Sequence, residues 1–345
     1  MSGGPARSSP QPESQQADCL IVGAGLAGLT AARRLASTGV RVLLVDKAKS
    51  PGGRLATRRI GSARLDHGAQ FFTVRSADFA AEVETWVEDG VVDVWTNGFS
   101  HDDGHPRYRA VEGMSSIAKY LAGRLQSELL RPPTHASRAQ ANAVVAAGDT
   151  WSVTYEAGCR EPDEALAMIL TPPVPQCVEL LRSGAVATPH LDELAAIDYH
   201  KVIAILVTLD RAPGLPEPGA IQQPDDLTFT FVADNQAKGV SVAPAVTFHC
   251  AHDLSRNLWS LDDGNVLAHV HEAMRRYLGG AAVNEVQVKR WRYAGPVEPR
   301  PEPCLVVADS PGPLVVAGDG FAGSKVEGAF LSGLAAAETV MNALR

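Results

Sequence analysis

Two patterns of apolar residues recur along the chain: the periodic spacing of a helix and the short continuous or alternating runs of a strand. Together they predict a protein of mixed helices and strands. Near the start, an apolar strand at residues 19–22 is followed by a glycine-rich turn and by a helix rich in Ala, Leu and Arg that ends near residue 37. A second buried strand covers residues 40–45. This order of strand, turn, helix and strand has the length that a parallel β–α–β crossover requires.

The rest of the chain continues both patterns. Helices are predicted at residues 77–88, 114–130, 266–278 and 326–344. Strands are predicted at residues 166–170, 202–209, 227–232, 246–250, 285–293 and 314–317, with further short strands between 131 and 158. Residues 51–73, which include glycines at 52, 53, 61 and 68, are predicted to form a loop.

Composition narrows the class of protein. The chain has 345 residues, enough for two domains, and 45% of them are hydrophobic, enough for a substantial core. Its 31 basic and 39 acidic residues give a net charge of −8, which argues against a surface for nucleic acid or for an anionic membrane. No apolar run approaches the ~20 residues that span a bilayer. We therefore expect a soluble enzyme-sized protein with neither nucleic acid nor membrane as a partner.

The cysteines and the N-terminus suggest a compartment. The five cysteines are odd in number and contain no CxxC pair, so neither a disulfide framework nor a zinc knuckle is predicted. Residues 1–17 lack the apolar stretch of a secretory signal and are interpreted as a flexible tail. The expected location is the reducing cytoplasm.

The first glycine-rich turn has the features of a dinucleotide site. Gly23 permits a tight turn, Gly25 lets backbone amides approach a pyrophosphate, and Gly28 lets the helix pack on the strand. The helix N-terminus favours the negative phosphates. Asp46, at the end of the second strand, is placed to accept hydrogen bonds from the adenosine ribose. A purely structural glycine turn is the alternative, and the motif alone does not separate NAD from FAD.

A second strand–turn–helix near the C-terminus favours FAD. Residues 314–317 are apolar, and Gly-Asp-Gly-Phe follows at 318–321 before the last helix. FAD bound end to end needs a second set of groups at its flavin half. Asp319 is suited to the ribityl hydroxyls, and a helix N-terminus to the pyrimidine carbonyl.

Two longer strings carry a family resemblance. PGGRLATR at residues 51–58 and DHGAQFF at 66–72 resemble the flavin amine-oxidase superfamily and, more narrowly, the renalase family. Shorter matches near residues 106–114, 170–176, 290–294, 318–321 and 326–329 extend the resemblance from residue 18 to the C-terminus.

The resemblance implies an α/β fold of two domains: an FAD-binding, Rossmann-type GxGxxG domain and a substrate domain with a mixed β-sheet. The FAD-binding domain would be discontinuous, over residues 18–75, 110–185 and 312–345. The substrate domain would comprise residues 76–109 and 186–311.

The resemblance also implies noncovalent FAD. Besides the glycines of the first turn, the implied contacts are Ala27, Asp46, Lys47, Gly53, Arg54, Ala69, Gln70, Ala139, Asp319 and Val326. Arg54 has an independent rationale, because a guanidinium can donate two hydrogen bonds to a diphosphate. Its alternative is an ordinary surface salt bridge.

On the substrate side, the resemblance implies that His200, His249 and Trp291 face the flavin ring and form the catalytic set. The implied substrate-binding residues are Pro106, Arg107, Tyr108, Arg109, Ala110 and His200. The alternatives are a strand-capping role for His200, a buried core position for His249, packing for Trp291 and plain surface charge for the arginines. A metal site is not predicted, because the two closest histidine pairs, 249/252 and 269/271, have no acidic partner at a useful spacing.

The implied activity is an oxidase that converts the 2- and 6-dihydro isomers of NAD(P)H to NAD(P)+. The implied partners are a dinucleotide substrate and O2, with H2O2 as the second product. An amine oxidase or desaturase of the same superfamily is one alternative, although no paired aromatic residues stand out in the sequence. A flavin-binding protein without catalytic function is another. The oligomeric state is left open.

Overall fold

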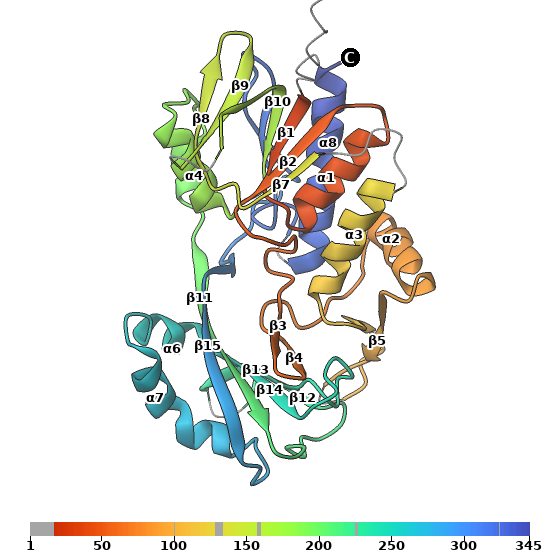
Figure 1. Cartoon of the computed structure of the whole chain (residues 1–345), viewed down its shortest axis with the longest axis vertical. Helices are drawn as coiled ribbons and strands as arrows, with labels where there is room; N and C mark the ends of the chain where they lie inside the picture. The colour runs from red at the N-terminus through yellow and green to blue at the C-terminus, as the bar shows by residue number, and fades with distance from the viewer. Residues whose placement is uncertain (1–16, 100, 128–133, 157–159, 225–226, 324) are drawn as a thin grey trace, which may run out of the picture.

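The computed structural model describes residues 17–99, 101–127, 134–156, 160–224, 227–323 and 325–345. It has two lobes, each built on one larger sheet, and two long strands run from one lobe to the other (Figure 1). The predicted tail over residues 1–17 lies outside the described residues except for Ala17, which begins the first strand.

The first lobe contains a mostly parallel sheet of eight strands. Its main order is β16-β17-β10-β1-β2-β7, and a β8–β9 hairpin extends from β10. The strands are β1 (Ala17–Val22), β2 (Val42–Asp46), β7 (Thr134–Ser137), β8 (Ala141–Ala147), β9 (Thr150–Tyr155), β10 (Asp163–Leu170), β16 (Leu305–Ala308) and β17 (Leu314–Val316). The central strands are apolar on both sides, as parallel strands covered on both faces require.

Helices cover both faces of this sheet. One face carries α1 (Leu26–Ala36), α3 (Ser115–Ser127) and α8 (Lys325–Ala343), and α2 (Ala77–Glu88) packs against the same core through Phe79, Val83 and Trp86. The other face carries α4 (Val174–Ser183) and α5 (Leu191–Ala195). The first strand, the first helix and the second strand confirm the predicted β–α–β unit.

The second lobe contains an antiparallel sheet of five strands in the order β12-β13-β14-β11-β15. These are β11 (Tyr199–Leu209), β12 (Ala220–Gln222), β13 (Phe229–Asp234), β14 (Ala245–Cys250) and β15 (Val283–Pro296). Ile203, Ile205 and Val207 alternate along β11 and face a core with α6 (His252–Asn257) and α7 (Asp263–Arg275). The intervening side chains of β11 face the first lobe.

Two hairpins extend from the first lobe toward the face of the second sheet that lies opposite α6 and α7. They are β3 (Thr57–Ile60) with β4 (Ala63–Asp66), and β5 (Val92–Thr96) with β6 (Arg107–Ala110). Ile60, Ala63 and Leu65 of the first hairpin pack on the second sheet. The loop predicted at residues 51–73 is therefore wrong in part, because the segment contains β3 and β4. The strand β3 was missed because it is mostly polar and lacks the apolar alternation that marks a strand.

Three elements pack outside the domain to which they were assigned, and the predicted division of the chain stays a prediction. Residues 186–311 were assigned to the substrate domain, but β16 pairs with β17 in the first sheet and α5 packs on α4. Likewise α2, within the predicted segment 76–109, packs on the core of the first lobe.

Within the described part of the chain, no helix is long and apolar enough to cross a membrane.

Candidate flavin and substrate site

The glycine turn between β1 and α1 is shaped for a ligand. Gly23 has φ +106°, and a Cβ on Gly28 would lie 1.9 Å from the carbonyl oxygen of Gly23, so the helix packs directly on the turn. A Cβ on Gly25 would meet nothing within 4 Å. Gly25 begins α1 without a side-chain cap, which leaves backbone N–H groups of the first turn available to an anion.

Asp46 lies beside this turn. Its carboxylate accepts hydrogen bonds from the backbone N–H groups of Ala24 and Ala48, both at 2.6 Å. Ala139 is buried next to it and donates its N–H to the Asp46 carbonyl at 2.8 Å. Lys47 is exposed at the same strand end. Three of the predicted FAD contacts, Asp46, Lys47 and Ala139, thus lie together at this strand end.

Arg54 links the segment after the first glycine turn to the second strand–turn–helix unit near the C-terminus. Its guanidinium makes two bonds to the carboxylate of Asp319, one of them at 2.7 Å, and Tyr199 donates its hydroxyl to the same carboxylate at 3.2 Å. Burial disfavours the charge on Arg54, but Asp319 outweighs this effect and the pKa of Arg54 is raised. The Arg54 salt bridge is therefore largely buried, unlike the surface pair considered from the sequence.

The remaining predicted flavin contacts surround this ion pair. Gly53 lies 3.6 Å from Gly25, measured from an ideal Cβ to the Cα, and Ala69 donates its N–H to the Arg54 carbonyl at 3.0 Å. Val326 is buried in the first turn of α8, and Ala27 in the first turn of α1. The uncapped α1 turn, the open Gly25 position and the buried Arg54–Asp319 pair fit an FAD molecule bound end to end.

Two of the three predicted catalytic side chains converge on one backbone oxygen. Trp291 Nε1 donates to the carbonyl of His67 at 2.7 Å, and His249 Nε2 lies 3.2 Å from the same oxygen. Because a carbonyl oxygen only accepts, the contact with His67 places the His249 proton on Nε2, and Gln70 Nε2, itself a donor, then makes no hydrogen bond to that atom. The His67 ring stacks on Trp291 with 5.2 Å between centroids, and Gln70 Nε2 lies 3.4 Å from His249 Nε2.

Both histidines of this group are neutral at physiological pH. Burial lowers the pKa of His67 to about 4, and the positive charge of Lys289 adds to the effect. Burial likewise lowers the pKa of His249 to about 4, against the hydrogen bond to the His67 carbonyl, which raises it. Neither imidazole is therefore a cation near pH 7.

His200 lies in a different contact. Its ring stacks on His252 at 3.9 Å between centroids, with 13° between the ring planes. Burial, followed by the neighbouring His200, lowers the pKa of His252. Within the part of the chain described, Nδ1 of each ring is buried without a hydrogen-bond partner. His200 as a group facing the flavin stays a prediction.

The side chains of the predicted substrate segment, residues 106–110, alternate between the two sides of β6. Arg107 bonds to Asp103 and to the His105 carbonyl within its own loop, and Arg109 pairs with Asp93 at 2.8 Å. Tyr108 instead stacks on Phe72 at 5.5 Å. Ala110 is fully buried in the core of the first lobe, and Pro106 is half-buried at the start of the hairpin strand. The side chains of the two arginines are thus already paired, and the substrate role of this segment stays a prediction.

Two features of the site were not predicted. Asp66 and Lys238 form a fully buried ion pair at 2.7 Å, although 172 positions separate them in the chain. Four aromatic side chains also meet, with 5.0–6.3 Å between ring centroids: Phe71, Trp95, Phe99 and Phe231. The DHGAQFF string contains Asp66 and Phe71, but nothing local indicates their distant partners.

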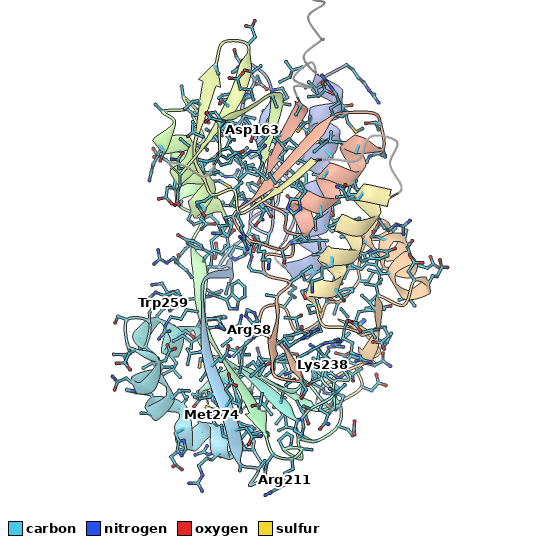
Figure 2. The ribbon with its side chains drawn as sticks, viewed as in Figure 1. Arg58, Asp163, Arg211, Lys238, Trp259 and Met274 are labelled. Carbon is cyan, nitrogen blue, oxygen red and sulfur yellow. The ribbon has the colours of Figure 1, made fainter. Side chains whose placement is uncertain are left out.

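Positive charge gathers near His67. Arg58 and Lys289 both act on its ring, and Arg58 extends toward β15, where its Nε donates to Gln287 at 3.2 Å (Figure 2). Among the ion pairs of the described residues, none neutralises Arg58 or Lys289. The same part of the chain holds no cluster of three or more His, Cys, Asp or Glu side chains that could bind a metal ion.

The two lobes, the uncapped glycine turn and the groups around it define a flavin-dependent oxidoreductase. Residues 21–83 match an NAD(P)-binding Rossmann-like domain, and residues 90–341 match the flavin containing amine oxidoreductase family. The chain belongs to this family, and its cofactor is FAD, bound noncovalently.

Two curated relatives match short segments of the chain. A hydroxyneurosporene desaturase of Rubrivivax gelatinosus is 48% identical over 56 residues, which are 16% of this chain and 11% of the relative. The lysine-specific histone demethylase 1 homolog 2 of Oryza sativa subsp. japonica is 49% identical over 70 residues, which are 19% of this chain and 9% of the relative. The matches thus span about a tenth of the length of these relatives.

Solved structures match over nearly the whole chain. A putrescine oxidase bound to putrescine has a TM-score of 0.69 at 14% identity, covering 95% of this chain and 99% of that one. A CLA-producing fatty acid isomerase from P. acnes has a TM-score of 0.58 at 13% identity, covering 81% and 87%. At such identities the likeness establishes the fold.

The buried Arg54–Asp319 pair leads to a first prediction. Asp319→Ala should reduce FAD retention, because it removes the acceptor that we expect the ribityl chain to use and leaves the Arg54 charge without its partner. Retention is measured by dialysis and by the ratio of flavin to protein absorbance. Asp149→Ala, at an exposed turn, is the control and should leave the ratio unchanged. Full FAD retention by Asp319→Ala would contradict the prediction.

Proposed function

We propose that this chain is an FAD-dependent oxidase of the 2- and 6-dihydro isomers of NAD(P)H, which it returns to NAD(P)+ with O2 as electron acceptor and H2O2 as product. Bound FAD supplies a two-electron acceptor that dioxygen can reoxidise. The narrower resemblance of the GGR and DHGAQFF strings to the renalase family supports this choice of substrate.

The charge around His67 is the observation that carries the proposal. Arg58 and Lys289 bring positive charge to this ring, while the nearby carboxylate of Asp66 is neutralised by Lys238. A dinucleotide donor carries a negatively charged diphosphate, which such a surface attracts. The same two cations would repel a protonated amine. Among the described residues around His67, the carboxylate of Asp66 is already paired with Lys238 and does not offset this repulsion.

The neutral histidines also suit a hydride donor. A dihydronicotinamide loses hydride directly and becomes aromatic, so no proton is abstracted in the bond-breaking step. His249 and Trp291 are tied to the His67 carbonyl, and this arrangement is suited to orienting a ring rather than to accepting a proton.

Discrimination among donor isomers is the direct test of the substrate. On anaerobic mixing, the 2- and 6-dihydro isomers should bleach the flavin rapidly, whereas ordinary 4-dihydro NADH should react slowly or not at all. Hydride transfer needs the donor carbon roughly 3–3.5 Å from the acceptor, and a pocket that fixes the ring in one orientation presents only one side of it. Rapid bleaching by NADH without a response to the isomers would refute the proposal.

Substitution of the histidines tests the direct-hydride mechanism. His249→Ala and His200→Ala should slow anaerobic reduction by less than the ~10²–10⁴-fold expected when a general base is lost. Because the pKa values of His67 and His249 lie at about 4, both rings stay neutral as pH rises. The rate at saturating donor should therefore be nearly flat above about pH 5 and should fall only as the pH approaches these values.

Two outcomes would contradict this mechanism. One is a variant that keeps FAD but loses flavin reduction altogether. The other is a saturated rate that follows a single ionisation near pH 6–7, the ordinary histidine range.

An amine oxidase or desaturase is the second candidate. The cluster of Phe71, Trp95, Phe99 and Phe231 favours it, because an aromatic enclosure suits a neutral amine or an apolar chain. A desaturase is among the curated relatives that match a short segment, and a putrescine oxidase shares the fold. Bleaching of the flavin by an amine, and not by any dihydronicotinamide isomer, would establish this candidate instead.

A further inference from the structure

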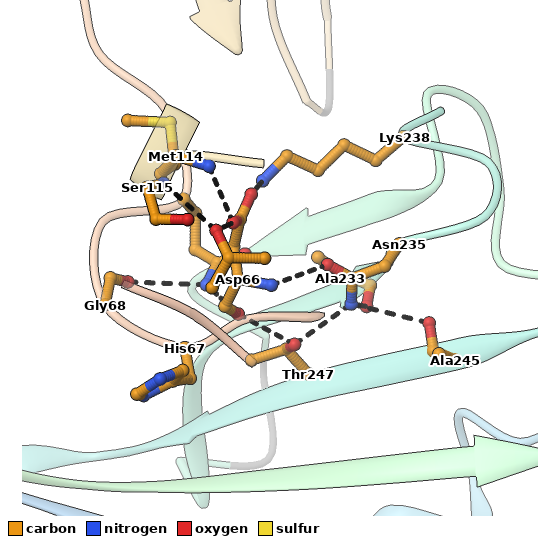
Figure 3. A network of polar contacts seen from close by, with 12 residues as sticks. Asp66, His67, Gly68, Met114, Ser115, Ala233, Asn235, Lys238, Ala245 and Thr247 are labelled. Atoms are coloured by element: carbon orange, nitrogen blue, oxygen red, sulfur yellow. Dashed lines mark hydrogen bonds and ion pairs between the residues drawn. The ribbon is translucent and has the colours of Figure 1, made fainter. Parts of the chain in front are cut away.

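Asp66 is fixed at every polar atom it carries. Oδ1 accepts from Thr57 Oγ1 at 2.6 Å and from the Met114 N–H at 2.8 Å, and Oδ2 accepts from Lys238 Nζ at 2.7 Å (Figure 3). Its N–H donates to Asn235 Oδ1 at 3.1 Å. Its carbonyl accepts from Thr247 Oγ1 at 2.9 Å and from the Gln70 side chain at 2.7 Å.

These partners come from separate parts of the fold. Thr57 lies on β3 and Met114 precedes α3 in the first lobe, whereas Lys238 and Thr247 belong to the second lobe. The Asp66 and Lys238 side chains are both 0% exposed. Asp66 is therefore a junction at which the β3–β4 hairpin is tied to the second sheet.

Among the described residues, Asp66 is the ion-pair partner of the Lys238 ammonium. This ammonium also lies 5.1 Å from the Trp95 ring centroid. Burial lowers the pKa of Lys238, and Asp66 opposes this effect. A buried pair of this kind is costly to form, and removing one partner leaves the other charge buried and unpaired.

The next residue after this junction supplies the shared acceptor of the site. The His67 carbonyl receives Trp291 Nε1 and His249 Nε2. In the second sheet, Trp291 is opposite Val202 and His249 is opposite Ala204, so the two side chains share one face. The position of one peptide oxygen therefore sets the orientation of both side chains.

We propose that Asp66, held by Lys238 and Thr57, is a positioning residue that fixes the His67 carbonyl and thereby aligns His249 and Trp291 toward the substrate. This inference deepens the proposed function and rests on it for the choice of substrate. Asp66 and Lys238 themselves touch neither reacting group. They act through the peptide that follows Asp66.

The test uses Thr57→Val, which removes the hydrogen bond from Thr57 Oγ1 to Asp66 and the one that the same oxygen accepts from the Ser115 N–H at 3.0 Å. Thr57 is far from His249 along the chain. Thr57→Ser is the rescue, since it restores the hydroxyl. Ile205→Val is the matched control, because Ile205 is buried in the same second sheet but faces α7. All are compared as FAD-loaded proteins, and Lys238→Met is added where it folds.

Two readouts separate positioning from general loss of stability. The first is the limiting rate of anaerobic flavin reduction against the apparent dissociation constant of the 6-dihydro isomer. The second is the histidine side-chain ¹⁵N spectrum, in which His249 is assigned by comparison with His249→Gln. This spectrum reports whether the His249 proton remains on Nε2, and it needs no substrate.

We expect Thr57→Val to lower the limiting rate on the order of tenfold, less than the ~10²-fold that a 1 Å misplacement causes, with the dissociation constant nearly unchanged. The His249 signal should move, Thr57→Ser should restore both readouts, and Ile205→Val should change neither. Unchanged rate and unchanged His249 signal in Thr57→Val would overturn the inference, as would equal effects in Ile205→Val. If no dihydronicotinamide isomer reduces the flavin, the proposed function fails, while the ¹⁵N spectrum still decides the positioning role.

Discussion

Gly28→Ala should yield a protein that purifies largely without its yellow cofactor. The added Cβ would lie 1.9 Å from the carbonyl oxygen of Gly23, so either the turn or the helix must move. Overpacking of this kind costs roughly 1–3 kcal/mol or more, and here the strain falls on the backbone that we expect to contact the pyrophosphate. The flavin-to-protein absorbance ratio and reconstitution with added FAD measure the effect.

Gly123→Ala is the control for this substitution. Gly123 also lies in a helix, α3, but a Cβ there would meet nothing within 4 Å. Because alanine favours a helix over glycine by about 1 kcal/mol, this variant should be as yellow as the parent and no less stable. A Gly28→Ala protein that retains FAD at the parental ratio would contradict the role given to the turn.

Lys238→Met should be the most destabilising of the single substitutions in the second lobe. It leaves the carboxylate of Asp66 buried without its ion-pair partner, for which the expected loss is about 3–5 kcal/mol. The free energy of unfolding is measured by urea denaturation of the FAD-loaded protein. Lys119→Met, at an exposed position of α3, should change it by no more than about 0.5 kcal/mol.

The double variant Asp66→Asn/Lys238→Met separates the charge from the packing. With both charges removed, a large part of the lost stability should return, since a buried pair contributes little net stability over uncharged groups of similar volume. A double variant as unstable as Lys238→Met alone would show that the loss arises from packing around the lysine stem and not from the unpaired charge.

The parts of the fold that were predicted correctly are those with local signals. β1, α1 and β2 follow one another with apolar runs and a glycine turn, and α2 was predicted with the same bounds that the structure has. The last helix, α8, was predicted to within one residue at each end. In each case the spacing of apolar residues matches the face that the element buries.

Elements without such a pattern were missed. The β3–β4 hairpin has four-residue strands with charged side chains, and its turn gives no signal beyond Gly61. The β5–β6 hairpin has a register irregularity at residues 94–96 that breaks the alternation. The helix α4 begins immediately after a pair of prolines, and no element was predicted there.

The site was predictable only where it follows a motif. Asp46 and Asp319 stand at the ends of recognisable strand–turn units, and the structure places both beside glycine turns. Lys238 and the four aromatic residues come from segments far apart in sequence. Their meeting depends on how the second sheet packs against the two hairpins, which no local pattern reports.

Stopped-flow mixing determines whether this flavoprotein takes its electrons from an anionic dihydronicotinamide donor. The FAD-loaded protein is mixed anaerobically with the 2-dihydro and 6-dihydro isomers, with NADH, and with a panel of amines that includes putrescine, and oxygen is then admitted. We expect rapid bleaching by the two isomers alone, one NAD(P)+ per flavin reduced, and H2O2 when the colour returns. Bleaching by an amine together with no response to either isomer would contradict this expectation.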